Sequence, residues 1–219
     1  MRFKLRKQHL IKIAKNLFFI ILIAIFFLLF WFALKIILNT EYPILPVSSS
    51  GMCTISVDCD GFSHPFEPTS HVGDLVIVQG VNATAVECNP YSEILVFHTP
   101  KQNFNDEDRL IITRAIAKLE VNGTIYFLTK GDGEGTHKWP EPPDMQECNY
   151  YRGNYTYNGM ISEELLVGKV VFRIPWVGHL VLFMQKAPEI SIILSLIIIL
   201  LVVKWVISVF IGKKAKHKF

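Results

Sequence analysis

The chain has 219 residues, of which 51% are hydrophobic and 19% charged, and its formal net charge is +3 at pH 7. The charge is uneven: ten Lys and Arg face all 19 Asp and Glu between residues 39 and 189, which gives this middle part a net charge of −9. An acidic domain repels phosphate, so nucleic acid is excluded as a partner. The length suits one folded domain of about 100–150 residues with membrane segments.

Two apolar stretches flank the acidic middle part, and each approaches the roughly 20 residues that cross a bilayer as helix. The first is longer than the core of about 7–15 residues in a cleaved signal peptide, and no small-residue cleavage site follows it, so it is predicted to be a retained anchor. Basic residues lie outside both stretches, which predicts cytoplasmic ends and an external middle part. We therefore predict two membrane spans, at residues 17–38 and 190–211, and an external domain between them at residues 41–186. The tails at residues 1–16 and 212–219 are predicted to be cytoplasmic.

All four cysteines fall in the predicted external part, where disulfides are expected, and four cysteines allow three pairings. We favour Cys53 with Cys59, which closes a small loop, and Cys88 with Cys148. A metal site is the alternative, but no Cys-x-x-Cys pair is present and we predict no metal. The same part holds three sequons for N-glycosylation, at Asn82, Asn122 and Asn154.

Short segments rich in Val, Ile, Phe and Tyr recur in the external part, separated by turn residues. The predicted strands are residues 74–81, 94–99, 110–120, 124–129 and 166–174. Asn122-Gly123 suits a tight hairpin turn between the third and the fourth. Residues 53–65 and 131–160 are predicted to be loops, and the proline-rich segment 42–46 to be an extended linker. The fold class is therefore mainly β: a compact antiparallel β domain.

A serine cluster, Ser48-Ser49-Ser50-Gly51-Met52, lies just outside the first span, where a membrane-bound protease would keep its nucleophile. Six further motifs follow it in order along the chain. They are Glu67-Pro68-Thr69, Val72-Gly73-Asp74-Leu75-Val76, Ile94-Leu95-Val96-Phe97-His98-Thr99-Pro100, Ile112-Thr113-Arg114-Ala115, Phe127-Leu128-Thr129-Lys130-Gly131-Asp132, and Val167-Gly168-Lys169-Val170-Val171-Phe172-Arg173-Ile174-Pro175. In this order, over roughly residues 18–185, the chain resembles signal peptidase I, most closely the archaeal and endoplasmic-reticulum type.

The resemblance implies a serine endopeptidase, without a cofactor, that removes signal peptides from translocated preproteins. It implies a plasma membrane or an endoplasmic-reticulum-like membrane as the location, and signal peptides, the lipid bilayer and the translocation machinery as partners. It also implies a substrate-binding role for the motif residues Met52, Pro68, Asp74 and Arg114.

The catalytic positions of the family carry over poorly. In the family, a serine before the methionine is the nucleophile, a histidine before the arginine is the general base, and an aspartate after Lys-Gly supports them. In this chain those positions hold Gly51, Thr113 and Asp132. Glycine has no nucleophilic atom, and threonine cannot accept a proton near neutral pH as imidazole can.

Three hypotheses follow. In the first, Ser50 or Ser49 serves as the nucleophile through a backbone adjustment at Gly51, with His137 or His98 as the base. In the second, the protein is a relative impaired in catalysis that keeps the fold and binds signal peptides or membrane proteins without hydrolysis. In the third, it is an unrelated receptor-like or structural β domain. The family resemblance also predicts that Ser50 and Thr113 lie near each other.

Overall fold

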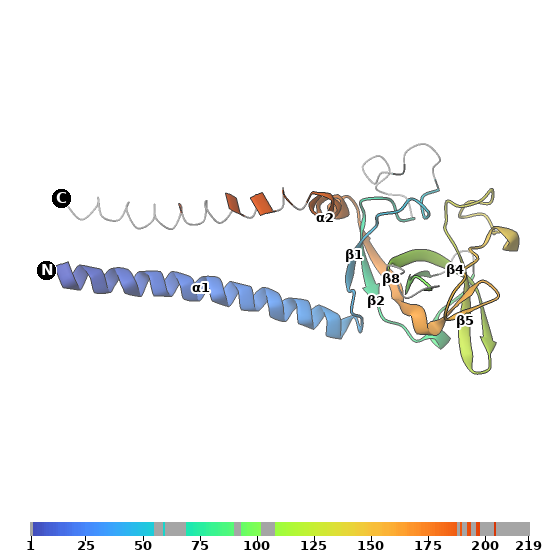
Figure 1. The fold of residues 1–219 in the computed structure, drawn as a ribbon, viewed down its shortest axis with the longest axis horizontal. Helices are drawn as coiled ribbons and strands as arrows, with labels where there is room; N and C mark the ends of the chain where they lie inside the picture. Colours follow the sequence, from blue (N-terminus) through green and yellow to red (C-terminus); the bar gives the residue numbers. More distant parts are fainter. Residues whose placement is uncertain are drawn as a thin grey trace.

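The computed structural model describes residues 2–54, 59, 69–89, 93–101, 108–187, 189, 192–193, 196–197 and 204. A long N-terminal helix, α1 (Arg2–Ile37), projects from a curled β sheet, and its N-terminus lies far from that sheet (Figure 1). Pro68 and almost all of the predicted second span lie outside the described residues. That span stays a prediction.

Helix α1 carries the first apolar stretch. Its segment Phe18–Ile37 has 20 residues with a mean hydropathy of 2.9, and none of it is buried against the rest of the protein. A helix of this length and composition can cross a bilayer. Among the described residues it is the one helix that meets these criteria.

Eight strands form one sheet in the order β1-β2-β8-β3-β4-β5-β7-β6, and every neighbouring pair is antiparallel. Their bounds are β1 Ile44–Pro46, β2 Leu75–Gln79, β3 Ile94–His98, β4 Leu110–Val121, β5 Thr124–Lys130, β6 Thr156–Tyr157, β7 Met160–Ser162 and β8 Leu166–Ile174. Short 3-10 turns lie at Ala83–Ala85 (η1), Met145–Glu147 (η2) and Glu163–Leu165 (η3), and a second helix, α2, spans Val177–Lys186. The prediction of a mainly β, antiparallel fold is confirmed.

Three strands fall in segments that the sequence predicts as linker or loop. Strand β1 lies in the proline-rich linker, β6 lies near the end of the 131–160 loop, and β7 begins at the last residue of that loop. Strands β1 and β6 are the two edges of the sheet. An edge strand tolerates proline because one side of its backbone needs no partner, so Pro46 ends β1 without breaking the pairing with β2.

The turn between β4 and β5 has the predicted geometry. Asn122 and Gly123 have φ angles of 53° and 83°, as the tight turn between Val121 and Thr124 requires.

Two apolar clusters, one on each face of the curled sheet, form the core. In β3, Leu95 and Phe97 pack into one cluster, whereas Val96 packs into the other with Val47 and Val76. This alternation is the period-2 pattern of a strand with both faces covered.

The serine cluster leaves the sheet beside the start of β2. Val47 N donates to Asp74 O at 2.9 Å, and Gly73 N donates to Val47 O at 2.9 Å. This pair of hydrogen bonds fixes the point from which Ser48, Ser49 and Ser50 extend.

One disulfide joins Cys53 to Cys59, whereas Cys88 and Cys148 are free thiols, so the predicted Cys88–Cys148 bond is not formed. The Cys148 thiol lies 3.8 Å from the carbonyl oxygen of Asp144, whereas Cys88 packs against the apolar cluster that contains Val86 and Leu95. Burial raises the pKa of Cys88 to about 11.

We expect iodoacetamide to modify two cysteines in the denatured, unreduced protein and four after reduction, as counted by mass spectrometry. In the double variant Cys53→Ser/Cys59→Ser the count is two under both conditions, and the closed loop contributes about 2 kcal/mol of stability that this variant lacks. Finding no modified cysteine before reduction would show that Cys88 and Cys148 do pair.

Candidate functional site

The candidate site lies where three segments meet: the turn at Gly51, strand β4 at Thr113 and Arg114, and the turn that follows β5. Gly133 N donates to Gly51 O at 3.1 Å, which joins the first segment to the third. Arg114 pairs with Lys130 across β4 and β5, which joins the second to the third. Three family motifs that are distant in the sequence thus share one place in the fold.

The turn at Gly51 and the turn that follows β5 contact each other through backbone atoms, without side chains between them. A Cβ atom on Gly131 would overlap the carbonyl oxygen of Gly51, and one on Gly133 would overlap that of Cys53. Only residues without a side chain allow this close approach.

Arg114 and Asp132 form a buried, bidentate ion pair at the centre of the site. Arg114 Nε donates to Asp132 Oδ1 and Nη2 to Oδ2, each at 2.7 Å, and the two side chains are only 6% and 2% exposed. The guanidinium also lies over the Trp139 ring, 5.2 Å from its centroid. Burial raises the pKa of the Asp132 carboxyl, and the hydrogen bonds from Arg114 lower it in part. Asp132 therefore holds Arg114 in this structure.

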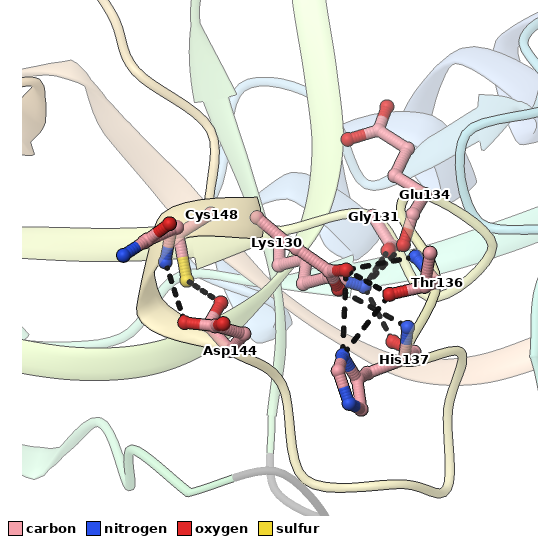
Figure 2. A network of polar contacts seen from close by, with 9 residues as sticks. Lys130, Gly131, Glu134, Thr136, His137, Asp144 and Cys148 are labelled. Carbon is pink, nitrogen blue, oxygen red and sulfur yellow. Dashed lines mark hydrogen bonds and ion pairs between the residues drawn. The ribbon is translucent and has the colours of Figure 1, made fainter.

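Lys130, at the end of β5, holds the turn that follows it. Its buried Nζ donates to the carbonyl oxygens of Glu134, of His137 at 2.8 Å, and of Gly131 at 3.5 Å (Figure 2). An ammonium group has three donors and no acceptor, so these three carbonyls use its full capacity.

Replacing this ammonium should loosen the turn. In Lys130→Met the carbonyls of Glu134 and His137 lose their donor, which costs about 1–3 kcal/mol for each polar group that stays buried. We expect faster hydrogen exchange at residues 131–139, with the Asn122-Gly123 hairpin as an unchanged internal reference. The same exchange rates in the variant and the native protein would show that Lys130 does not hold the turn.

Thr113, which the family resemblance places at the histidine position, lies beside a tyrosine. Thr113 is 5% exposed and its hydroxyl makes no hydrogen bond among the described residues, although the Tyr151 hydroxyl lies close enough for Thr113 to lower the pKa of that phenol slightly. Tyr151 Oη lies 3.4 Å from Thr129 Oγ1. Burial raises the pKa of Tyr151 overall, so the phenol is neutral near pH 7. Of these three hydroxyls, none is a general base at neutral pH.

Glu134 occupies the space beside Gly51. A Cβ atom on Gly51 would lie 2.9 Å from Glu134 Oε1, and the same side chain passes over Gly131. Asn149 Nδ2 donates to Glu134 Oε2 at 2.7 Å. Sequence reasoning missed Glu134, Asn149 and Tyr151, because no motif marks them within the 131–160 loop.

The serines and the proposed substitute bases are placed as follows. Ser49 and Ser50 are exposed, and Ser50 O accepts from Cys53 N at 2.9 Å. The exposed ring of His137 contacts Glu147, with Nδ1 3.3 Å from Oε1. His98 bonds Asp108 at 2.8 Å and lies at the end of β3 opposite Leu110, about 13 Å along the strand from the residue that pairs with Arg114. The proximity of Ser50 to Thr113 stays a prediction.

The residues predicted to bind substrate are mostly inside the protein. Met52 is 1% exposed, and Asp74 is fully buried, with its carboxylate accepting from His71 N at 2.8 Å and lying 3.2 Å from Arg173 Nη1. Within the described ranges, no group of three His, Cys, Asp or Glu side chains could hold a metal ion.

An antiparallel β domain behind an apolar N-terminal helix, with these three motifs at one place, is the arrangement expected of the signal peptidase I family. The chain is 25% identical over 173 residues to the signal peptidase complex catalytic subunit SEC11 of Verticillium alfalfae, and 24% identical over 173 residues to the SEC11 subunit of Fusarium vanettenii. Each match covers 79% of this chain and 81% of the relative. They confirm that the chain is related to the signal peptidase I family. No family model and no solved structure matches the chain.

Proposed function

We propose that the protein is a membrane-anchored, signal-peptidase-type protein that engages signal peptides of translocated preproteins and is impaired in their hydrolysis. One observation supports this proposal: three of the motifs that resemble the family lie at one place in the fold, and the positions matched to its serine and histidine hold Gly51 and Thr113. The hydrogen bond from Gly133 N to Gly51 O and the Arg114–Asp132 pair build that frame. The relatives are catalytic subunits by name, which supports the substrate class.

The proposed loss of hydrolysis follows from the lack of a serine and a histidine at the two reactive positions. A serine hydroxyl is a weak nucleophile unless a base lies within hydrogen-bond reach, and the base must itself be oriented. Thr113 cannot act as that base. Ser50 is one residue away from the family position, and neighbouring residues of an extended segment point to opposite sides. A displacement of about 1 Å already costs about 100-fold in rate.

Binding of a signal peptide requires neither a serine at position 51 nor a histidine at position 113. We propose that the substrate lies extended beside the sheet, as in strand addition, with α1 and the apolar helix of the signal peptide in the same bilayer. A shared bilayer raises the effective concentration of the two partners. In this arrangement both chain ends are cytoplasmic, the β domain is external, and the translocation machinery delivers the substrate.

The test follows a labelled preprotein in liposomes that contain the native chain or its Ser50→Ala variant. We expect photo-crosslinking of the signal peptide to both proteins and cleavage by neither. Cleavage that is lost in Ser50→Ala, together with labelling by a serine-directed probe, would establish an active enzyme that uses Ser50. Absence of both crosslinking and cleavage would overturn the proposed function.

A further inference from the structure

Glu134 places a carboxylate in the part of the site that the missing nucleophile would occupy. Its side chain runs through space left by Gly51 and Gly131, neither of which has a Cβ atom. Figure 2 shows this side chain pointing away from the Lys130 ammonium, which bonds the backbone carbonyl of Glu134 instead. The carboxylate is half-buried and faces Gly51.

Two acceptor oxygens here have no donor among the described residues. Glu134 Oε2 accepts from Asn149 Nδ2, while Oε1 faces Gly51 without a hydrogen bond. Asn149 Oδ1 is buried and also makes no hydrogen bond. The orientation of this amide is fixed, because a carboxylate only accepts and Nδ2 must therefore face Glu134. Asn149 Oδ1 is buried, whereas Glu134 Oε1 belongs to a half-buried side chain and is the acceptor that a ligand can reach from solvent. The carboxylate therefore favours a ligand that supplies N–H groups.

The two cationic side chains near Glu134 already have hydrogen-bond partners. The three Lys130 donors serve three carbonyls, and Arg114 is paired in bidentate form with Asp132. A backbone amide of a bound peptide would supply one donor but also bring a carbonyl acceptor. An ammonium supplies three donors, a guanidinium supplies five, and neither has an acceptor.

We propose that Glu134 determines specificity: a Lys or Arg side chain of the bound peptide approaches the Glu134 carboxylate from solvent and donates to its Oε1. This inference rests on the proposed peptide-binding function and adds the chemical class that the site selects. Because Gly51 has no side chain, the Glu134 carboxylate fits against its backbone, and Oε1 stays without a protein donor. A hydrogen bond to a charged partner changes affinity by about tenfold to a hundredfold.

The test uses the full chain in detergent micelles and fluorescent peptides that span the C-terminal part of a signal peptide. Each peptide carries Lys at one position, and its matched partner carries Met there. We expect at least one Lys peptide to bind about tenfold more tightly than its Met partner. Glu134→Gln should bring that ratio close to one. The control Glu164→Gln removes the same charge from an exposed position in η3 and should leave the ratio unchanged.

Three outcomes would overturn the inference. If the native chain prefers no Lys peptide, or if Glu134→Gln keeps the native ratio, Glu134 does not select the ligand and the proposed function still stands. If no peptide binds any of the proteins, the proposed function fails as well.

Discussion

The triple variant Gly51→Ser/Thr113→His/Glu134→Ala should cleave a labelled preprotein at least about 100-fold faster than the native chain. Serine at 51 restores the hydroxyl, and histidine at 113 restores a base with a pKa near neutral. Removal of the Glu134 carboxylate clears the oxygen that would otherwise lie 2.9 Å from the new Cβ atom. The measurement is the rate at which the signal peptide is released in liposomes.

The matched control for this experiment is Gly51→Ala/Thr113→His/Glu134→Ala, which differs by a single hydroxyl and should not cut. If the variant with serine is folded and also fails to cut, residues 51 and 113 do not meet in the cleft. If both variants cut, the nucleophile lies elsewhere, and Ser50 becomes the first residue to replace.

Removal of Arg114 should destabilise the β domain by about 3–5 kcal/mol, because Arg114→Met leaves the Asp132 carboxylate buried without its partner. The expected readout is a lower midpoint in urea unfolding, followed by tryptophan fluorescence, to which Trp139 against the guanidinium contributes. The double variant Arg114→Met/Asp132→Leu removes both charges and should lose less stability than the single variant.

Arg152→Met is the control for Arg114→Met. Arg152 is exposed and lies 5.8 Å from the Tyr150 ring centroid, so its replacement should cost only about 0.5–1 kcal/mol. An equal, small loss in Arg114→Met would show that the Arg114–Asp132 pair adds no net stability.

The sequence predicted those strands whose own residues favour a β conformation. Strands β2, β3, β4, β5 and β8 have continuous Val, Ile and Phe content, and Asn122-Gly123 has the residues that a tight turn demands. The prolines around β1 made that segment look like a linker and not like a strand. Strands β6 and β7 have only two and three residues and exist because β5 offers them an edge. Pairing of this kind is a property of the assembled sheet.

The candidate site was predictable only in part, for a similar reason. Gly51, Thr113, Arg114 and Asp132 could be named because they belong to ordered motifs. Glu134 could not be named in this way, because its side chain lies against two glycines, one of which is 83 residues away in the sequence. The free thiols Cys88 and Cys148 were predicted as a pair because spacing along the chain does not show which cysteines meet in the fold.

The glycine contact between the two turns also constrains the order in which this site could change by mutation. With Glu134 in place, a serine gained at position 51 places its Cβ atom against a carboxylate oxygen. A residue with a side chain at 131 or 133 displaces a backbone carbonyl and disturbs the whole frame. A hydroxyl at position 51 therefore requires the flexible end of Glu134 to move aside, whereas Gly131 and Gly133 have to stay glycine. Because a base at position 113 needs a further substitution, hydrolysis at this site would take at least two changes.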